Sequence, residues 1–387
     1  MPNIRFLITS SIFSQTASAS LMRAHAKGLG SKATFVCYCI PNNEVEQMDG
    51  LSGSTISYRY PSFLRKVITE KWINRLSGTL GLIVDFAVHQ LSSNDTLILH
   101  SSSALVIFCL SSIAKLKKKT VSIYRTEIPH RPTYNLILRL ATKLTYINVS
   151  IMIVETNRMK EYYKKHVCPK AIVHVLYSVV DCEDVLNAKR KDIGREYFAY
   201  CGLISAEHKD GLLTIISAFS IIAKRYKTIS LVIAGACSSI EYMEKIRSLI
   251  FDCGLEERVL LTGRLSRSDY ASYLKGASLL VNGKSKDSHN SYGFSSKIVE
   301  YLYSGNPVLM TRSDEYSDIL CEEEAIFIDE SRADDYINKF DFVLSNPDRA
   351  RTIGSNGREK ALALFNYRKM ASELLEIALF ESRMNNI

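Results

Sequence analysis

Lys297 and Glu300 lie three positions apart in the segment GFSSKIVEYLYSGNPVLMT, residues 293–311. Residues at this spacing share one face of a helix, and a helix N-terminus carries unpaired backbone N–H groups and a partial positive charge. A lysine in the first helical turn opposes the helix dipole, so we expect an anion beside it. A carboxylate such as Glu300 can accept hydrogen bonds from two neighbouring hydroxyl groups. A phosphate on Lys297 and a ribose on Glu300 would suit a nucleoside diphosphate.

The residues around this pair support a phosphate site. Gly293 would let the backbone approach a phosphate closely, and Phe294, Ser295 and Ser296 would form the loop and the N-cap. An alternative stays open from the residues alone. Lys297 and Glu300 could form an exposed i,i+3 ion pair, which would contribute only about 0.2–0.5 kcal/mol.

Strands and helices alternate along the chain, and this pattern predicts an α/β protein with parallel sheets. The predicted strands of the first half are IRFLI, ATFVCYCI, DTLILH, TVSIY, IMIVE and VHVLY. Those of the second half are YFAYCG, SLVIAG, RVLLTG, SLLVN, PVLM and AIFI. The predicted architecture is two Rossmann-like, doubly wound domains that face each other across a cleft.

Four segments follow from this pattern. Residues 1–180 form a first domain, 181–196 a polar linker, 197–366 a second domain, and 367–387 a C-terminal helix that could close the structure. A length of 387 residues agrees with two domains.

Composition excludes several classes of protein. No apolar run reaches membrane-spanning length, and the first ten residues are typical of a strand and not of a signal peptide, so we predict a cytoplasmic protein. The nine cysteines show no Cys-x-x-Cys spacing, which argues against a zinc site or a disulfide framework. Residues 1–190 contain 24 Lys and Arg against 12 Asp and Glu, whereas residues 191–387 contain 25 against 28.

The second half resembles the retaining GT-B glycosyltransferases of family 4. The resemblance runs from Tyr197 to Tyr367 and rests on several blocks in order. They are YCGLISAEHKDGLLTIISAF, SLVIAG, CGLEERVLLTGRLSRSDYASYLKGASLLVN, YGFSSKIVEYLYSGNPVLMT and SNPDRARTIGSNGREKALALFNY.

The resemblance implies roles for particular residues. The loop at Gly293 and Phe294 and the amides after it, including Ser295 and Ser296, would face the diphosphate of a nucleotide-sugar donor. Glu300 matches the second glutamate of the family's paired-glutamate motif and would bind the ribose. Lys209 matches the basic residue that neutralises the departing diphosphate.

Two positions depart from the family pattern. Tyr292 stands where the first glutamate of the pair is expected, and Leu203 stands where an arginine often follows the first glycine. Lys297 could supply the missing charge. Because no Asp-x-Asp metal signature ends a strand, Lys209, Lys297 and the helix N-terminus are expected to replace a divalent metal, with no cofactor.

The first half is expected to bind the acceptor, a glycan or a lipid-linked oligosaccharide. Glu127 at a strand end is the candidate that orients the acceptor hydroxyl, and His100 and Arg23 are further acceptor candidates. A loop carboxylate paired with Arg125 or Arg131 is the alternative for Glu127. For His100, the alternative is a buried, hydrogen-bonded histidine.

The basic first half also suggests contact with an anionic membrane. Leu64, Ile68, Trp72 and Leu76 recur every four residues in a segment with four cations, and lysines follow at 115–119. An ordinary surface helix is the alternative.

The sequence therefore favours a UDP- or GDP-sugar glycosyltransferase of surface polysaccharide synthesis, with a nucleotide-sugar-binding pseudoenzyme second. A nucleic-acid-binding protein is disfavoured because no recognised module or aromatic-basic interleaving is present.

Overall fold

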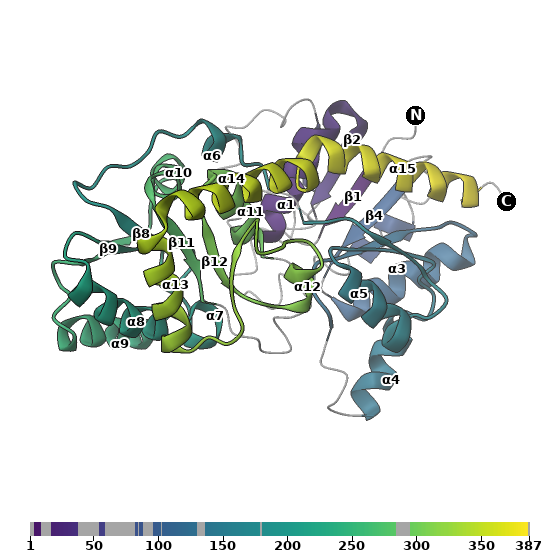
Figure 1. Ribbon diagram of the computed structural model, residues 1–387. Helices are drawn as coiled ribbons and strands as arrows, with labels where there is room; N and C mark the ends of the chain where they lie inside the picture. The colour runs from purple at the N-terminus through teal and green to yellow at the C-terminus, as the bar shows by residue number, and fades with distance from the viewer. Residues whose placement is uncertain are drawn as a thin grey trace, which may run out of the picture. The chain divides into compact units, whose positions relative to one another are not determined.

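The computed structural model describes residues 4–8, 17–37, 54–58, 82–83, 85–87, 96–101, 103–129, 136–178, 180–283 and 295–385. The chain divides into two units. The first contains the residues up to Asp181 and the segment from Phe365 onward, and the second contains Cys182–Ser291 and Ser295–Leu364. Each unit holds one sheet of parallel strands (Figure 1).

The sheet of the first unit has seven strands in the order β3-β2-β1-β4-β5-β6-β7. Its strands are β1 Ile4–Ile8, β2 Ala33–Cys37, β3 Thr55–Tyr58, β4 Thr96–His100, β5 Ser122–Arg125, β6 Ile151–Val154 and β7 Ile172–Val175. All six predicted strands are present in the described residues. The sequence analysis missed β3, because this four-residue edge strand has no long apolar run.

Helices connect these strands and cover both faces of the sheet. They are α1 Ala17–Leu29, η1 Gly30–Lys32, α3 Ala104–Leu116, α4 Leu136–Thr145, α5 Asn157–Tyr162, the π-helix η6 Tyr163–Val167, and α15 Tyr367–Asn385. Strand side chains alternate between the faces. Ile4, Phe6 and Ile8 of β1 join one core cluster, whereas Leu7 joins the cluster on the opposite face.

Helix α15 belongs to the first unit although it lies at the end of the sequence. Its Met370, Leu374 and Ala378, four residues apart, pack into the same cluster as β1 and α1. Gly28 of α1 allows the close approach, because a Cβ there would lie 2.7 Å from the Tyr367 carbonyl oxygen. The expected C-terminal helix is thus present, and it completes the first unit's core (Figure 1).

The sheet of the second unit has six strands in the order β10-β9-β8-β11-β12-β13. Its strands are β8 Tyr197–Cys201, β9 Ser230–Ala234, β10 Val259–Gly263, β11 Leu279–Asn282, β12 Val308–Thr311 and β13 Ile326–Ile328. All six coincide with predicted strands. Five of them, all except β10, are buried at every residue, which is typical of a parallel sheet covered on both faces.

The helices of the second unit include one that the sequence analysis did not predict. They are α6 Glu183–Asn187, α7 Glu207–Asp210, α8 Leu212–Arg225, α9 Ile240–Asp252, α10 Arg267–Gly276, α11 Ser296–Ser304, α12 Asp314–Ser317, α13 Ala333–Ser345 and α14 Pro347–Leu364. The short helix α6 lies inside the expected linker 181–196. It packs beside α10 and α11 with Val185 fully buried, so this segment belongs to the second unit from Cys182 onward.

A buried carboxyl group on α15 gives the stability of the first unit a predictable pH dependence. Glu381 is fully buried, accepts a hydrogen bond from the Ser122 hydroxyl, and burial raises its pKa to about 8. A folded-state pKa above the unfolded value means that folding takes up a proton between about pH 4.5 and 8, so stability falls as the pH rises through this window. Each pH unit costs at most about 1.4 kcal/mol.

We expect Glu381→Gln to remove this dependence and still accept the Ser122 hydrogen bond. Urea unfolding should give similar stability for variant and wild type near pH 5, and a more stable variant above pH 8. The matched control is Glu376→Gln, at an exposed glutamate of the same helix, which should follow the wild type. A stability difference between Glu381→Gln and wild type that stays constant with pH would contradict a protonated Glu381.

Candidate nucleotide-binding site

The strand order of the second sheet locates a ligand site before any side chain is considered. Chain connections run in opposite directions from β8 and β11, which are neighbours at the centre of the sheet. Ligands of doubly wound sheets bind at the carboxyl ends of the strands at such a switch point. The loop after β8 and the helix α11 after β11 both lie at this point.

Glycines let the backbones approach closely at the end of β8. A Cβ on Gly235 would lie 1.8 Å from the carbonyl oxygen of Gly202, and the Gly202 N–H donates to the Ala234 carbonyl at 2.8 Å. These contacts fix the turn at Gly202 and Leu203. The side chain of Leu203 is 60% exposed beside it.

Helix α11 begins at Ser296, as the sequence predicts, and its Lys297 side chain lies against this turn. Ser295 is its N-cap residue with extended backbone, but its hydroxyl makes no capping hydrogen bond to the helix. The backbone N–H of Ser295 instead donates to the Tyr316 hydroxyl at 3.3 Å. Ser296 is the first helical residue. The N-terminus of this helix carries a partial positive charge, which favours an anion beside it.

Lys297 extends from the first turn of α11 across the end of β8. Its Nζ donates to the Tyr200 hydroxyl at 2.7 Å and lies 4.1 Å from the centroid of the same ring. Gly202 makes room for this side chain, because a Cβ there would lie 2.5 Å from the Lys297 Cε. A cation is therefore placed where the helix dipole would otherwise disfavour it.

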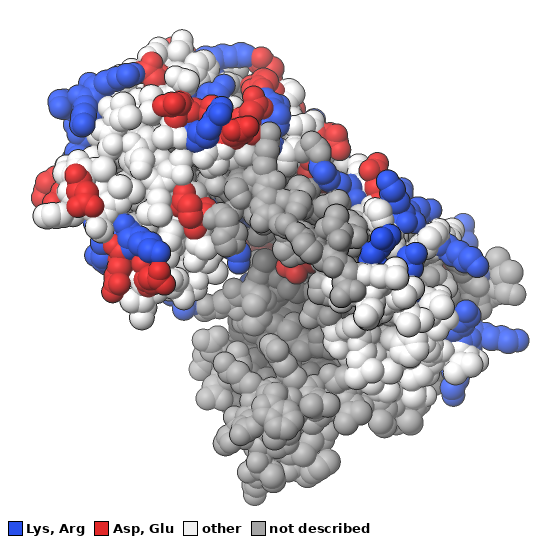
Figure 2. All heavy atoms as spheres, turned by 90° about the horizontal axis from the view of Figure 1, so that it is seen from below, with Lys and Arg blue, Asp and Glu red and all other residues white. Residues whose placement is uncertain are grey.

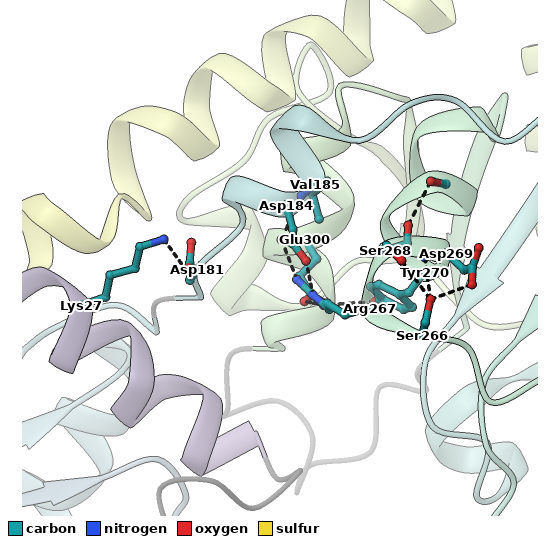
Figure 3. A network of polar contacts seen from close by, with 11 residues as sticks. Lys27, Asp181, Asp184, Val185, Ser266, Arg267, Ser268, Asp269, Tyr270 and Glu300 are labelled. Carbon is teal, nitrogen blue, oxygen red and sulfur yellow. Dashed lines mark hydrogen bonds and ion pairs between the residues drawn. The ribbon is translucent and has the colours of Figure 1, made fainter. Parts of the chain in front are cut away.

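Glu300 makes different contacts from those expected of an exposed Lys297–Glu300 ion pair. Its side chain is only 12% exposed. One carboxylate oxygen binds the Arg267 guanidinium, and the other accepts the Tyr270 hydroxyl at 2.8 Å (Figure 3). Each oxygen retains a second lone pair, so the carboxylate can still accept hydrogen bonds from a ligand.

Arg267 at the start of α10 was missed by the sequence analysis. Its guanidinium contacts both Glu300 and the carboxylate of Asp184 on α6, with 3.1 Å between Nη2 and Oδ1 in the second pair (Figure 3). Burial acts to lower the pKa of Arg267, but the two carboxylates raise it overall. Burial and the charge of Glu300 raise the pKa of Tyr270 well above its usual value. Arg267 and Tyr270 thus hold the Glu300 carboxylate in one orientation.

Lys209 lies on the short helix α7, with an exposed side chain after the carboxyl end of β8. The preceding Glu207 anchors this turn, because its carboxylate accepts the N–H groups of Leu213 and Thr214 and so caps α8. Gly211 has φ +64°, and a Cβ there would lie 2.4 Å from the Gly283 carbonyl oxygen. The loops after β8 and β11 therefore meet beside Lys209.

Two of the three acceptor candidates, His100 and Glu127, lie near the carboxyl ends of β4 and β5. His100 ends β4, and its ring packs edge-on against Tyr124 with 5.8 Å between centroids. His25 of α1 contacts the Tyr124 hydroxyl at 3.3 Å. Burial lowers the pKa of His100 to about 4 and that of His25 to about 3, so both rings are neutral at pH 7. His25 was not predicted, and its buried position on α1 gives it no sequence signal.

Glu127 follows β5 and has an exposed side chain. The alternative role for Glu127 is an ion pair with Arg125, so the contacts of that arginine are relevant here. Arg125 is buried and donates to the Ser101 carbonyl at 2.6 Å and the Tyr163 hydroxyl at 3.3 Å, and Tyr163 donates to the Glu127 carbonyl at 2.9 Å. Nearby Glu155 is buried, and burial raises its pKa to about 8.

Other predicted positions are partly described. Arg23 is half-buried on α1. Gly293, Phe294 and Tyr292 lie outside the described residues, as does Arg131. In the described part of the chain, no group of three or more His, Cys, Asp or Glu side chains could hold a metal ion.

Residues 186–360, which include α11 and the Lys297 and Glu300 contacts, match the family model described as glycosyl transferases group 1. This segment is a group 1 glycosyltransferase domain. The chain is also similar to the uncharacterized glycosyltransferase YqgM of Bacillus subtilis (strain 168). The two are 24% identical over 261 residues, which cover 67% of each.

Solved structures resemble nearly the whole chain. HepE of Anabaena in complex with UDP has a TM-score of 0.75 at 13% identity, covering 97% of this chain and 99% of that one. Sucrose-phosphate synthase of Thermosynechococcus elongatus has a TM-score of 0.72 at 14% identity, covering 97% and 98%. These matches confirm that this group 1 glycosyltransferase domain is part of a GT-B fold with two Rossmann-like domains. No helix among the described residues has the length and apolar character needed to cross a membrane.

Proposed function

We propose that this protein is a retaining glycosyltransferase that moves a sugar from a UDP- or GDP-sugar to a hydroxyl group of a glycan or lipid-linked oligosaccharide. Surface polysaccharide synthesis in the cytoplasm, at or near the inner face of the membrane, is the proposed setting. The single observation that carries this proposal is the arrangement of α11 in a group 1 glycosyltransferase domain. Its N-terminus and Lys297 lie beside the switch point, and Glu300 is held one turn further on.

The donor would bind with its diphosphate on this N-terminus and its ribose on Glu300. Lys297, and Lys209 in the neighbouring loop, would contact the diphosphate together with Gly293, Phe294, Ser295 and Ser296. Because HepE binds UDP on the same fold, UDP-sugars are the first donors to test.

The reaction breaks the bond between the anomeric carbon and the diphosphate oxygen, and the acceptor oxygen forms a new bond to that carbon. Negative charge grows on the departing diphosphate, which takes up the acceptor proton. Fixed cations and helix N–H groups stabilise this charge more in the transition state than in the ground state. In this proposal they take the place of a divalent metal.

The acceptor would bind to the first unit. Glu127 has an exposed carboxylate at the end of β5 and would orient the acceptor hydroxyl, while the neutral ring of His100 and the Arg23 side chain would bind acceptor hydroxyls.

A second candidate is a pseudoenzyme that binds a nucleotide sugar without transferring it. The observation that favours it is Leu203, an exposed aliphatic side chain where an arginine often stands in the family. Such a protein would bind UDP or GDP but would neither transfer nor hydrolyse the sugar.

The proposal is tested by a screen of UDP- and GDP-sugars for thermal stabilisation, followed by turnover assays. A donor at about 100 times its dissociation constant should add about 2.7 kcal/mol of stability. We expect one sugar nucleotide to stabilise the protein and to be consumed with an acceptor, with EDTA leaving the rate nearly unchanged. Binding without turnover across an acceptor panel would favour the pseudoenzyme. Loss of turnover in EDTA, restored by manganese, would overturn the metal-free mechanism.

A further inference from the structure

Helix α4 of the first unit presents its apolar side chains to the outside of the protein. Leu136, Leu140 and Leu144 recur every four residues and are 52–70% exposed, and Ile137 is 74% exposed. No residue of α4 is buried. A surface helix normally turns its apolar face toward the core. Here the apolar face is the outer one.

The opposite side of α4 and the turn after it attach the helix to the unit. Thr142 and Thr145 are half-buried, and Tyr146 is buried with its ring 5.7 Å from that of Tyr163. Asn148 donates to the Ser112 hydroxyl of α3 at 2.9 Å and accepts from Lys115. These contacts fix the direction in which the apolar face points.

Cations surround this apolar face. Arg139 and Lys143 lie four residues apart on α4, and Lys164 and Lys165 are exposed on the adjoining π-helix η6. Partial burial lowers the pKa of His166, and the charges of Lys165, Arg139 and Lys143 lower it further. These three cations therefore lie near one another. In Figure 2 a white patch bordered by blue Lys and Arg side chains lies in the region where α4 faces the viewer.

The surrounding sequence is strongly basic. Residues 96–178 contain 13 Lys and Arg against three Asp and Glu, a net charge of +10. One of the three carboxyl groups, Glu155, has its pKa raised to about 8 and is mostly neutral at pH 7. The partner of this face must therefore be anionic as well as apolar.

We propose that the α4 face, formed by Leu136, Ile137, Arg139, Leu140, Lys143 and Leu144, docks the protein on a bilayer containing anionic phospholipid. Aliphatic side chains enter the boundary between headgroups and acyl chains, while Lys and Arg bind the phosphate groups. A nucleic acid would use the cations but would leave the aliphatic stripe in water. This proposal does not depend on the reaction that the enzyme performs.

The α4 face differs from the membrane segment that the sequence suggests. The stripe of Leu64, Ile68, Trp72 and Leu76 lies outside the described residues and stays a prediction. The lysines at 115–119 lie at the end of α3, which packs beside α4. The positive charge of these lysines can add to that of the α4 face.

The experiment measures co-sedimentation of the full chain with phosphatidylcholine vesicles that contain phosphatidylglycerol or lack it. The wild type should bind the anionic vesicles, and binding should weaken as salt rises, because the Debye length is about 8 Å at physiological ionic strength. Arg139→Gln with Lys143→Gln should lower the affinity about thirtyfold, or about fivefold for each cation. Ile137→Ser, Leu140→Ser and Leu144→Ser together should remove the binding that persists at high salt.

Matched controls exclude general effects of hydrophobicity, charge and folding. Ile240→Ser with Phe251→Ser changes two side chains of α9 that are 82% and 71% exposed in the second unit, and vesicle binding should not change. Lys224→Gln with Arg247→Gln is the control for charge, at two exposed positions of the same unit. All variants should keep the wild-type melting temperature, since every substituted side chain is exposed.

Two outcomes would overturn the proposal. Vesicle binding of the serine variant equal to that of wild type would assign the contact to another part of the chain. A wild-type dimer that the serine variant converts to a monomer, without vesicle binding by either, would show that a second copy covers the α4 face.

Discussion

Replacing Lys297 with Met should lower kcat for sugar transfer by roughly 10²–10³-fold, the range seen when one preorganised donor to a developing oxyanion is removed. Met has a similar length and keeps the contact with Gly202 and the Tyr200 ring, but it has no charge. Because the diphosphate carries more negative charge in the transition state, KM for the donor should rise much less than kcat falls. Steady-state kinetics with varied donor concentration measure both effects.

A second lysine near the same helix provides the control. Lys275 Nζ donates to the Ser304 carbonyl at 3.1 Å, at the C-terminal end of α11, where a cation agrees with the helix dipole. Lys275→Met should therefore keep kcat near the wild-type value. If Lys297→Met raised KM strongly and left kcat unchanged, Lys297 would bind the donor without assisting departure of the diphosphate.

The second large effect concerns Glu300 and the arginine that holds it. Glu300→Ala should weaken binding of the preferred nucleotide, UDP or GDP, by tens-fold or more, because two hydrogen bonds to a charged acceptor are lost, each worth about 1.5–3 kcal/mol. Arg267→Gln should weaken binding less, because the carboxylate remains but is no longer fixed. Isothermal titration with the nucleotide and its 2′-deoxy form measures affinity and ribose discrimination.

A double-mutant cycle separates a role through Glu300 from a structural role. Arg267→Gln should reduce discrimination against the deoxynucleotide, and it should have little further effect on nucleotide affinity in a Glu300→Ala background. Arg349→Gln is the matched control, because Arg349 has the same 47% side-chain exposure as Arg267 and pairs with Glu323 on the surface of the same unit. A nucleotide affinity of Glu300→Ala within twofold of wild type would remove the ribose assignment itself. Equal effects of Arg267→Gln with and without Glu300 would remove only the positioning role.

The strands could be predicted because each buried parallel strand is a short apolar run between polar connections, as in SLVIAG. Helix α11 ends at Gly305, whose φ of +82° is typical of a glycine at a helix C-terminus. Contacts between distant residues could not be predicted in this way. Tyr200 lies 97 positions from Lys297, and Asp184 lies 83 positions from Arg267.

Prediction from the sequence had the same limit for two helices, α4 and α6. The apolar spacing of α4 would fit a helix packed on the core equally well, and only the three-dimensional structure shows that this face points outward. Helix α6 lies in a polar stretch, and it is recognised only through the pairing of Asp184 with Arg267 and the burial of Val185. Local sequence patterns describe single elements, whereas burial depends on what other elements leave uncovered.

The return of α15 to the first unit has a consequence for synthesis on the ribosome. The cluster that contains Phe6, Phe35 and Tyr124 is completed by Met370 and Leu374 of α15, near the end of the chain. While residues 182–364 are being made, that face of the first sheet lacks its last helix and presents apolar surface to water or to chaperones. The core of the first unit is therefore completed only after the second unit has been translated, and α15 determines when that core becomes fully folded.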